Sequence, residues 1–302
     1  MYRKNIVNKN VEGTINMKEK QKGLIVIVAL YCIAFIIAAI TYNRFETVFA
    51  ASAVFTAVAT LVVFLASCIF SDVSMYDPYW SVAPFVMLIF AVIRFGYWSV
   101  NAMIMLAVVG LWSIRLTVNW YITYKGIGNE DWRYAMYRKK LSSLMFLAVS
   151  FFGLHFMPTV VVYAALVSGL YAVGADSFSV LSLPGLLIMF LAILLEFVSD
   201  RSIHGFLEEH KGERKTCDVS VWKYSRHPNY LGEMSFWTGM YLYFLPLYPE
   251  KWYFGLGCLS IIALFLIVSI PMMEKHNMER REDYAVYKEK TSMLLLLPSR
   301  EK

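Results

Sequence analysis

Long apolar runs recur along the whole chain, and they constrain its fold more than any other feature. Eight runs are visible, and most approach the roughly 20 residues that a helix needs to cross the hydrocarbon core of a bilayer. They cover residues 24–40, 48–70, 79–93, 100–121, 144–172, 181–198, 231–245 and 252–273. The pattern predicts an all-α, polytopic transmembrane helix bundle with seven or eight spans.

Composition and the placement of cysteines exclude several other classes of protein. The 302 residues are 59% hydrophobic and 17% charged, against about 45–50% and 25% in soluble domains, so a soluble globule is excluded. The net charge is +6, yet no basic stripe with interleaved aromatic residues stands outside the apolar runs, so we expect no nucleic-acid partner. Three of the four cysteines lie inside apolar runs and Cys217 sits alone in a polar loop. We therefore expect neither a disulfide framework nor a metal site.

The distribution of lysine and arginine predicts the orientation of the spans. A polar leader, residues 1–22, precedes the first run without a cleavage pattern, so we interpret that run as a retained span. Alternate segments between the runs hold 24 and 3 of the 28 Lys and Arg residues, and one more lies inside a span. Positive charge prefers the cytoplasmic side, so both termini are expected there. No linker or repeat divides residues 23–298, which we interpret as a single transmembrane domain.

Three polar residues follow one another at the end of the sixth run. Glu196, Asp200 and His204 are spaced i, i+4 and i+8, which places them along one helix face. Ionisable groups in a span are costly unless they are paired or face water, so this face is a candidate site. Alternatively, Asp200 and His204 already lie in headgroup water and only Glu196 needs a partner.

Two further polar features inside the runs are interpreted as structural. Arg115 and Asn119 form another i, i+4 pair, and Arg115 could serve as a counter-ion for Glu196 or Glu233. His155 stands alone in an apolar helix, where an imidazole is more often a satisfied packing residue than a ligand.

The strongest local signal is the segment WKYSRHPNYLGEMSFW, residues 222–237. Pro228 disfavours helix at His227, so a helix should begin at or just after the proline. The N–H groups at that helix start, with Arg226 and His227 beside it, suit an anion. Asn229 and Glu233 add polar contacts on one face. The segment predicts a cofactor pocket, and the alternative is an interfacial anchor made of Arg and Tyr.

The usual nucleotide motifs are absent from the sequence. Neither GIGNED nor GLGCLS completes a Gly-x-Gly-x-x-Gly pattern, and there is no Walker sequence. Any nucleotide must then be held by helix ends and loops. The tail, residues 269–298, is long enough to cap such a pocket, although it could equally lie on anionic lipid as an amphipathic segment.

Taken together, these motifs resemble a known enzyme family. SRHPNYLGE resembles the C-terminal signature of the steroid 5α-reductase family, and the similarity extends through DPYW (77–80), RLTVNW (115–120), EDWRY (130–134), FGLHFMPT (152–159) and the tail. The set resembles the bacterial and plant branch of that family over residues 70–298. The RHP-x-Y core by itself also occurs in isoprenylcysteine methyltransferases and sterol C14 reductases.

The resemblance implies an NADPH site formed largely by residues 200–298, in a cavity that opens to the cytoplasm. The polar pair of the sixth helix would fall on Glu196 and Asp200, and the Asn and Glu of the signature on Asn229 and Glu233. The remaining residues implied at this site are His204, Tyr224, Arg226, His227 and Tyr230, with Glu274 and Asn277 closing it from the tail.

Conjugate reduction of an enone builds negative charge on the carbonyl oxygen, so a buried hydrogen-bond donor must face that oxygen. The segment DVSMYDPYW, which contains Asp72, Tyr76, Asp77 and Tyr79, supplies candidates. We expect Tyr79 to be the donor, with Asp77 beside it. The alternative is an interfacial aromatic belt with a proline bend.

The expected function is therefore NADPH-dependent reduction of a conjugated C=C bond in a membrane-dissolved enone, such as a 3-oxo-Δ4-steroid or a related lipid. An S-adenosylmethionine-dependent membrane methyltransferase of the isoprenylcysteine type is the alternative enzyme class. A non-catalytic lipid-binding protein is a third, although it would leave the costly polar groups unexplained. The expected partners are a hydrophobic small molecule and membrane lipid.

Overall fold

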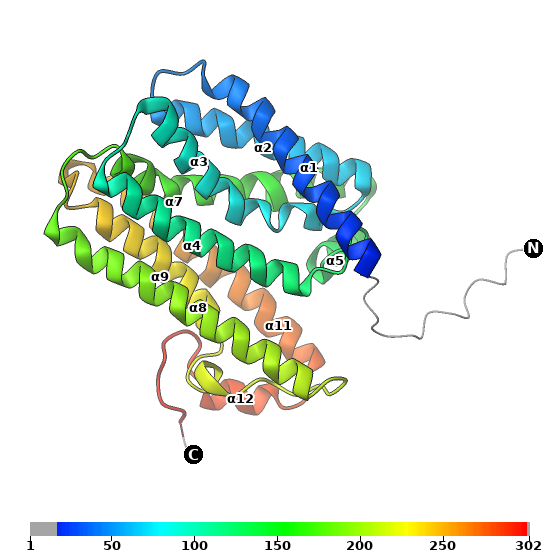
Figure 1. Cartoon of the computed structure of the whole chain (residues 1–302). Coiled ribbons are helices and arrows are strands. Elements are labelled where there is room, and N and C mark those ends of the chain that lie inside the picture. Colours follow the sequence, from blue (N-terminus) through cyan, green and yellow to red (C-terminus); the bar gives the residue numbers. More distant parts are fainter. Residues whose placement is uncertain (1–16, 301–302) are drawn as a thin grey trace, which may run out of the picture.

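The computed structural model describes residues 17–300, so most of the predicted leader lies outside the described residues. Within that part the chain is helical and contains no strand, which confirms the all-α bundle (Figure 1). Its α-helices are α1 (Met17–Tyr42), α2 (Val48–Phe70), α3 (Tyr79–Phe95), α4 (Val100–Thr123), α5 (Trp132–Lys140), α6 (Ser143–Val149), α7 (Met157–Val173), α8 (Leu183–Glu209), α9 (Pro228–Phe244), α10 (Gly255–Leu264), α11 (Ile270–Arg280) and α12 (Tyr284–Lys290).

Two long helices contain a π-helical segment. Residues Ser150–Phe156 join α6 to α7, and residues Phe265–Ser269 join α10 to α11. Short π segments inside α-helices occur frequently at functional sites. Both segments prove to line the same cavity.

The spans agree with the apolar runs of the sequence. Among the described residues, seven helices are long and apolar enough to cross a membrane. The remaining predicted span, residues 231–245, corresponds to α9, which has 17 residues, the lower limit for a span. It begins at Pro228, as predicted. Helix α8 continues to Glu209, past the end of the apolar run at residue 198, and so contains the helix face predicted for Glu196, Asp200 and His204.

Glycines bring α8 and α9 into close antiparallel contact. A Cβ atom on Gly185 would collide with the backbone of α9 at Tyr243, and one on Gly232 would collide with the Glu196 side chain. Gly239 approaches the carbonyl oxygen of Gly185, which lies 2.8 Å from its ideal Cβ position. Small residues at such an interface let two membrane helices approach closely, and here they place the polar face of α8 against the start of α9.

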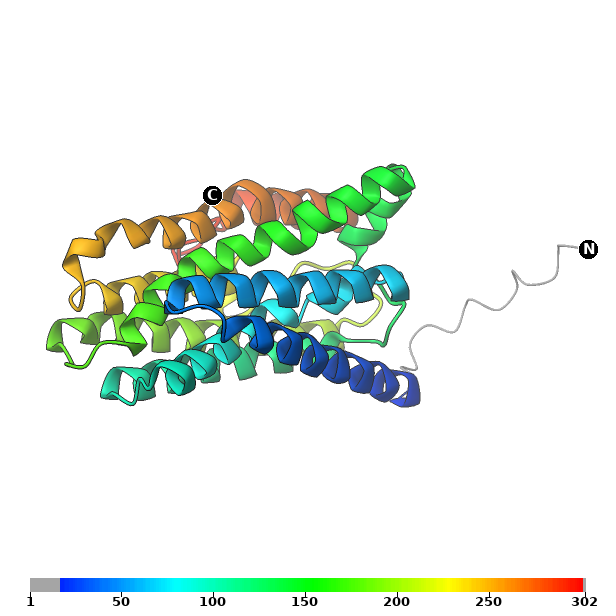
Figure 2. The ribbon, with the colours of Figure 1, turned by 90° about the horizontal axis from the view of Figure 1, so that it is seen from above.

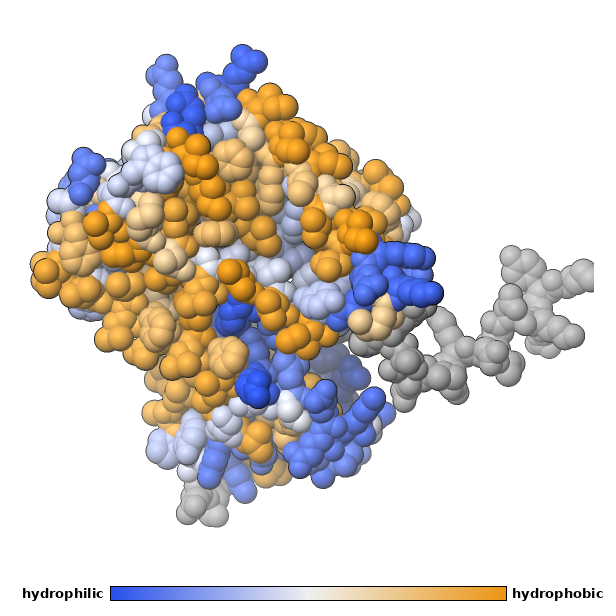
Figure 3. Space-filling view, in the orientation of Figure 1, coloured by the Kyte–Doolittle hydropathy of each residue, from blue (hydrophilic) through white to orange (hydrophobic). Residues whose placement is uncertain are grey.

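One end of the bundle, which we call the α12 end, gathers the start of α1, the loops before α5 and α9, and the tail (Figures 1 and 2). Lys20 Nζ donates to the Ile122 carbonyl oxygen (3.5 Å), and the Arg226 N–H donates to that of Ser292 (2.9 Å). Hydrophobic side chains cover most of the face in Figure 3, and hydrophilic ones gather around α12. Both ends of the described chain therefore lie at the same end of the bundle.

Candidate functional site

A central cavity of about 600 Å³ opens between α3, α4, α8, α9 and the two π segments. Its volume lies within the roughly 300–1,000 Å³ of small-molecule sites. Towards the α12 end it is bordered by the short helix α5. Its deeper walls carry polar side chains from three helices and from the turn before α3, namely Tyr76, Asp77, Arg115, Asn119, Glu196, Asp200, Asn229, Tyr230 and Glu233.

Arg115 holds two carboxylates of α8. Its Nη2 atom contacts Glu196 Oε2, and its Nη1 atom donates to Asp200 Oδ2 at 2.6 Å. The side chains are 9%, 1% and 14% exposed respectively, so little water reaches the pairs. This confirms the predicted counter-ion role for Glu196. With Glu233 nearby on the same cavity wall, one cation faces three carboxylates.

Glu233 is held by two tryptophans. Its Oε2 atom accepts from Trp112 Nε1 (3.1 Å) and its Oε1 atom from Trp237 Nε1 (2.8 Å). The residue is only 4% exposed. Two indole donors therefore fix the carboxyl group of the signature helix at the cavity wall.

Other polar groups at the cavity have no protein partner within residues 17–300. Glu196 Oε1 is buried without a hydrogen bond, and neither the Asn229 amide nor the Tyr230 hydroxyl makes one. The Tyr230 ring is held between His227, at a centroid distance of 5.3 Å, and Phe265, at 4.9 Å. Asn229 and Tyr230 are only partly buried, whereas Glu196 Oε1 is fully buried, and because buried polar groups are normally satisfied this oxygen points to a ligand that completes the site.

A chain of hydroxyl groups runs inward from the opposite wall. Tyr76 bonds Thr159 (2.8 Å), Thr159 bonds Thr60 (3.0 Å), and Thr60 donates to the Tyr79 hydroxyl (3.2 Å), which in turn donates to the Thr56 carbonyl oxygen (3.2 Å). Tyr76 lines the cavity, whereas Tyr79 lies behind it and is 1% exposed. Tyr79, the donor expected from the sequence, is therefore connected to the cavity only through the hydroxyl chain that ends at Tyr76.

Each hydroxyl in this chain carries one proton, and in the arrangement above every proton points away from the cavity. The reverse arrangement, with every proton towards the cavity, requires Tyr79 to give up its bond to the Thr56 carbonyl oxygen. In the first arrangement Tyr76 donates to Thr159. In the second, Thr159 donates to Tyr76, which frees the Tyr76 proton for a molecule in the cavity. The wall can therefore act as an acceptor or as a donor.

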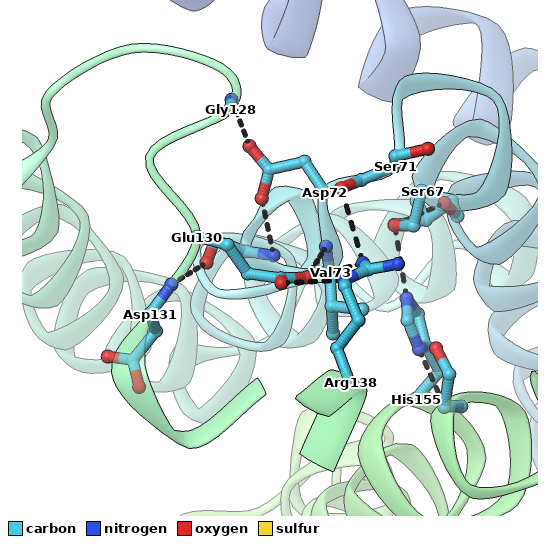
Figure 4. A network of polar contacts seen from close by, with 12 residues as sticks. Ser67, Ser71, Asp72, Val73, Gly128, Glu130, Asp131, Arg138 and His155 are labelled. Carbon is cyan, nitrogen blue, oxygen red and sulfur yellow. Dashed lines mark hydrogen bonds and ion pairs between the residues drawn. The ribbon is translucent and has the colours of Figure 1, made fainter. Parts of the chain in front are cut away.

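The turn between α2 and α3 that carries Tyr76 is fixed by the loop before α5 (Figure 4). Asp72 Oδ2 accepts from the Gly128 N–H (2.7 Å), and Glu130 Oε1 accepts from the Val73 N–H (3.1 Å) and from Arg138 Nη2 (2.7 Å). Burial raises the pKa of Asp72, although its backbone hydrogen bonds oppose the shift. The network joins the cavity wall to α5.

Helix α5 contributes a second contact to the same wall. The Tyr134 hydroxyl donates to Asp77 Oδ1 at 2.6 Å. Burial and then the charge of Asp77 hold the pKa of Tyr134 well above its ordinary value, so Tyr134 keeps its proton. Trp132 stacks on His276 of α11 with ring centroids 3.7 Å apart. These contacts hold α5 over the cavity opening.

His155 has the packing role that we inferred from the sequence. Its Nδ1 atom lies 2.8 Å from the Ser150 carbonyl oxygen and its Nε2 atom 3.1 Å from Ser67 Oγ. In the neutral Nδ1–H tautomer His155 donates to Ser150, and Nε2 accepts from Ser67 only when Ser67 gives up its bond to the Val63 carbonyl oxygen (3.0 Å). The ring also packs on Phe64 and Tyr76, so His155 supports the cavity wall.

Several residues implied at the cofactor site lie outside the cavity. Glu274 is occupied by Arg226 (Nη2 to Oε1, 2.6 Å) and Lys288 (2.7 Å), while Arg226 Nη1 donates to the Thr291 carbonyl oxygen (2.6 Å). These contacts tie the tail to the start of α9. The lining of the cavity does not include Tyr224, Arg226, His227, Glu274 or Asn277, and His204 faces a groove on the outer side of α8.

Sequence reasoning missed Trp112, Trp237, Thr159 and Tyr134. Spacing offered a signal for two of them, because Trp237 lies four residues after Glu233 and Trp112 three residues before Arg115. Thr159 ends the motif FGLHFMPT, in which the sequence singles out only His155 as a polar residue inside an apolar helix.

Comparison with known proteins places the chain in a family. A family model described as "Protein of unknown function (DUF1295)" matches residues 63–291, which contain the whole cavity wall. The searches of curated proteins and of solved structures give no match. Since the matched region is well over half of the sequence, the chain belongs to the DUF1295 family.

Proposed function

We propose that this protein is a membrane NADPH-dependent reductase of a conjugated C=C bond in a hydrophobic enone, similar to the steroid 5α-reductases. One observation carries the proposal. A single cavity brings Asn229 and Glu233 of the signature helix and Glu196 and Asp200 of the polar stripe opposite a hydroxyl donor, Tyr76. A hydride transfer to an enone needs one wall that binds the nicotinamide and a second wall that donates a hydrogen bond to the carbonyl oxygen.

The unpartnered atoms fit a nicotinamide. The buried Glu196 Oε1 can accept from a carboxamide, and the Asn229 amide can both donate and accept. The carboxylates Glu196, Asp200 and Glu233 outnumber the cation Arg115, and excess negative charge favours a ring that becomes positive on oxidation. NADPH, when bound, supplies the hydride for conjugate addition.

The residues of the opposite wall would stabilise the substrate. Tyr76 donates to the carbonyl oxygen as negative charge develops there, and Thr159 donates to Tyr76 in the reversed hydroxyl chain. Asp77 is held by Tyr134 beside this point. Apolar residues of the π segments enclose the hydrocarbon body and exclude water.

The first test is thermal stabilisation of the detergent-solubilised protein by NADPH, NADH and S-adenosylmethionine. A specific ligand at 100 times its Kd adds about 2.7 kcal/mol. Asn229→Ala and Glu233→Ala should abolish the NADPH effect, whereas Asn277→Ala, outside the cavity, should keep it. Equal NADPH shifts in all three variants would refute the cofactor site.

The second test follows the hydride. With NADPH deuterated at C4 of the nicotinamide and a Δ4-3-ketosteroid, deuterium should appear at the β-carbon, because the α-proton comes from solvent. Deuterium on a reduced carbonyl carbon would instead indicate an alcohol-forming enzyme.

A second candidate function is methyl transfer from S-adenosylmethionine. The same excess of carboxylates over Arg115 would also suit a sulfonium cation. Stabilisation by S-adenosylmethionine without any effect of NADPH would favour this alternative.

We also propose that the α12 end faces the cytoplasm, where a nucleotide is available. The Lys and Arg distribution supports this orientation. Tags at either terminus should then be labelled only after the cells are permeabilised, and labelling in intact cells would refute the orientation.

A further inference from the structure

A second hollow lies on the outer surface of the bundle, between α4 and α8. It has a volume of about 710 Å³, again in the range of single small-molecule sites. Its apolar part is formed by side chains that remain exposed, among them Leu111, Ile114, Phe190, Leu194 and Phe197. We call it the α4–α8 groove.

The α4–α8 groove is polar at one end only. Both helices run towards the α12 end, and the polar residues lie late in each of them, with Asn119 on α4 and Arg201, His204 and Glu208 on α8. Hydrophilic side chains interrupt the hydrophobic surface between these helices in Figure 3. An amphiphile in the adjoining leaflet, with its polar end at the surface, has the same polarity.

Arg201 is suited to hold the polar end of such a molecule. It is exposed, lines the groove, and makes no ion pair or hydrogen bond with any of the described residues. An arginine at this depth can extend its stem along apolar surface and present its donors to an oxygen atom.

Polar side chains lie between the groove and the central cavity. Arg115, Asn119 and Asp200 line both hollows. Across the partition, Arg115 pairs with Asp200 (2.6 Å), and His204 Nε2 bonds Asn119 Oδ1 (2.7 Å). A rotation of these side chains would connect the two spaces without unpacking the helices.

We propose that the α4–α8 groove is the membrane entrance of the central cavity. It takes from the leaflet at the α12 end an amphiphile with a hydrocarbon body and one oxygen-bearing polar end. This inference rests on the proposed function only for the identity of that molecule as the enone substrate. The side chains of Asn119 and His204, which lie between the groove and the cavity, rotate apart to admit this molecule.

Gly205 allows a direct test, because it lines the polar end of the groove and a Cβ atom there would meet nothing within 4 Å. Gly205→Trp should fill the groove without disturbing the core. Leu194→Trp blocks the apolar part independently. Ile36→Trp, on a lipid-exposed position of α1 away from the groove, is the matched control.

The probe is palmitic acid carrying a diazirine, added to the full chain in phosphatidylcholine nanodiscs, with cross-linked peptides mapped by mass spectrometry. In the wild type we expect adducts on residues 111–122 and 190–208 and on the cavity wall at residues 261–272. Gly205→Trp and Leu194→Trp should lower both by at least about tenfold, equivalent to about 1.4 kcal/mol of binding. The control should label like the wild type.

Two results would overturn the entrance. One is label spread evenly over lipid-facing helices of the wild type, and the other is cavity labelling that both tryptophan variants leave unchanged. The experiment uses no NADPH, so a failure of the proposed cofactor would appear in the stabilisation assay and would leave this result interpretable.

Discussion

Arg115→Met tests whether the buried ion cluster depends on its one cation. The change removes the contacts of Arg115 with Glu196 and Asp200, whose side chains are 1% and 14% exposed. Breaking a buried pair by removing one partner costs about 3–5 kcal/mol, because the remaining charge stays desolvated. At about 2 °C per kcal/mol for a chain of this size, the apparent Tm should fall by roughly 6–10 °C.

The assay is thermal unfolding in detergent, followed by the loss of monodisperse protein on size exclusion. Arg201→Met is the matched control, since Arg201 is exposed and forms no ion pair with the described residues, and it should change stability by no more than about 0.5 kcal/mol. Adding Glu196→Gln and Asp200→Asn to Arg115→Met should restore much of the loss. A Tm like that of the wild type in Arg115→Met alone would refute the reasoning, because the carboxyl groups would then need no counter-ion.

Three further predictions concern catalysis, pH and packing. Tyr76→Phe should lower turnover of a Δ4-3-ketosteroid by about 10²–10³, the usual loss for one oxyanion donor, and should leave the stabilisation by NADPH intact. Tyr79→Phe should lower turnover by a smaller factor. If steady-state kinetics show the reverse order, the donor role returns to Tyr79. Burial raises the folded pKa of Asp72, so the contribution of this residue to stability is complete below the unfolded pKa of about 3.9 and is lost as the pH rises through the folded pKa. The Tm of the wild type minus the Tm of Asp72→Asn should therefore fall as the pH is raised from 4. A difference in Tm that stays constant with pH would contradict this. Gly185→Val should separate α8 from α9 and lower the stability of the protein in thermal unfolding by about 1–3 kcal/mol. Gly205→Ala, with open space around the new side chain, should not destabilise the protein. Equal stability of the two variants would exclude close packing at Gly185.

The sequence was sufficient to predict the spans because hydrocarbon length and hydropathy determine them almost alone. Their ends were less predictable. The sixth run loses its apolar character after residue 198, yet α8 continues to Glu209, because its polar side chains bond residues of α4 instead of breaking the helix. Hydropathy records where lipid ends, and a helix can extend beyond that point.

The cavity was predicted in part. Most residues that the resemblance placed on α8 and α9, such as Glu196 and Asn229, do line it, because helical spacing decides which side chains share a face, whereas His204 of α8 faces the outer groove. Arg226, from the loop before α9, and Glu274, from α11, form a clamp between these two elements instead. Tyr76 and Tyr79 are three residues apart across a 3-10 turn and Pro78, and no periodicity tells which of them faces inward.

The two π segments affect how relatives of this chain can be aligned with it. A π turn closes its hydrogen bond at i+5 and so holds one residue more than an α turn. Deleting one residue between 150 and 156 would restore an α-helix and leave the residues of α7, Thr159 included, on their present faces, whereas the same deletion in a plain α-helix would rotate everything beyond it by about 100°. A relative that lacks the π turn therefore has the same cavity-facing residues only when the alignment places a one-residue gap at this point, and site assignments copied without that gap would name the wrong side chains.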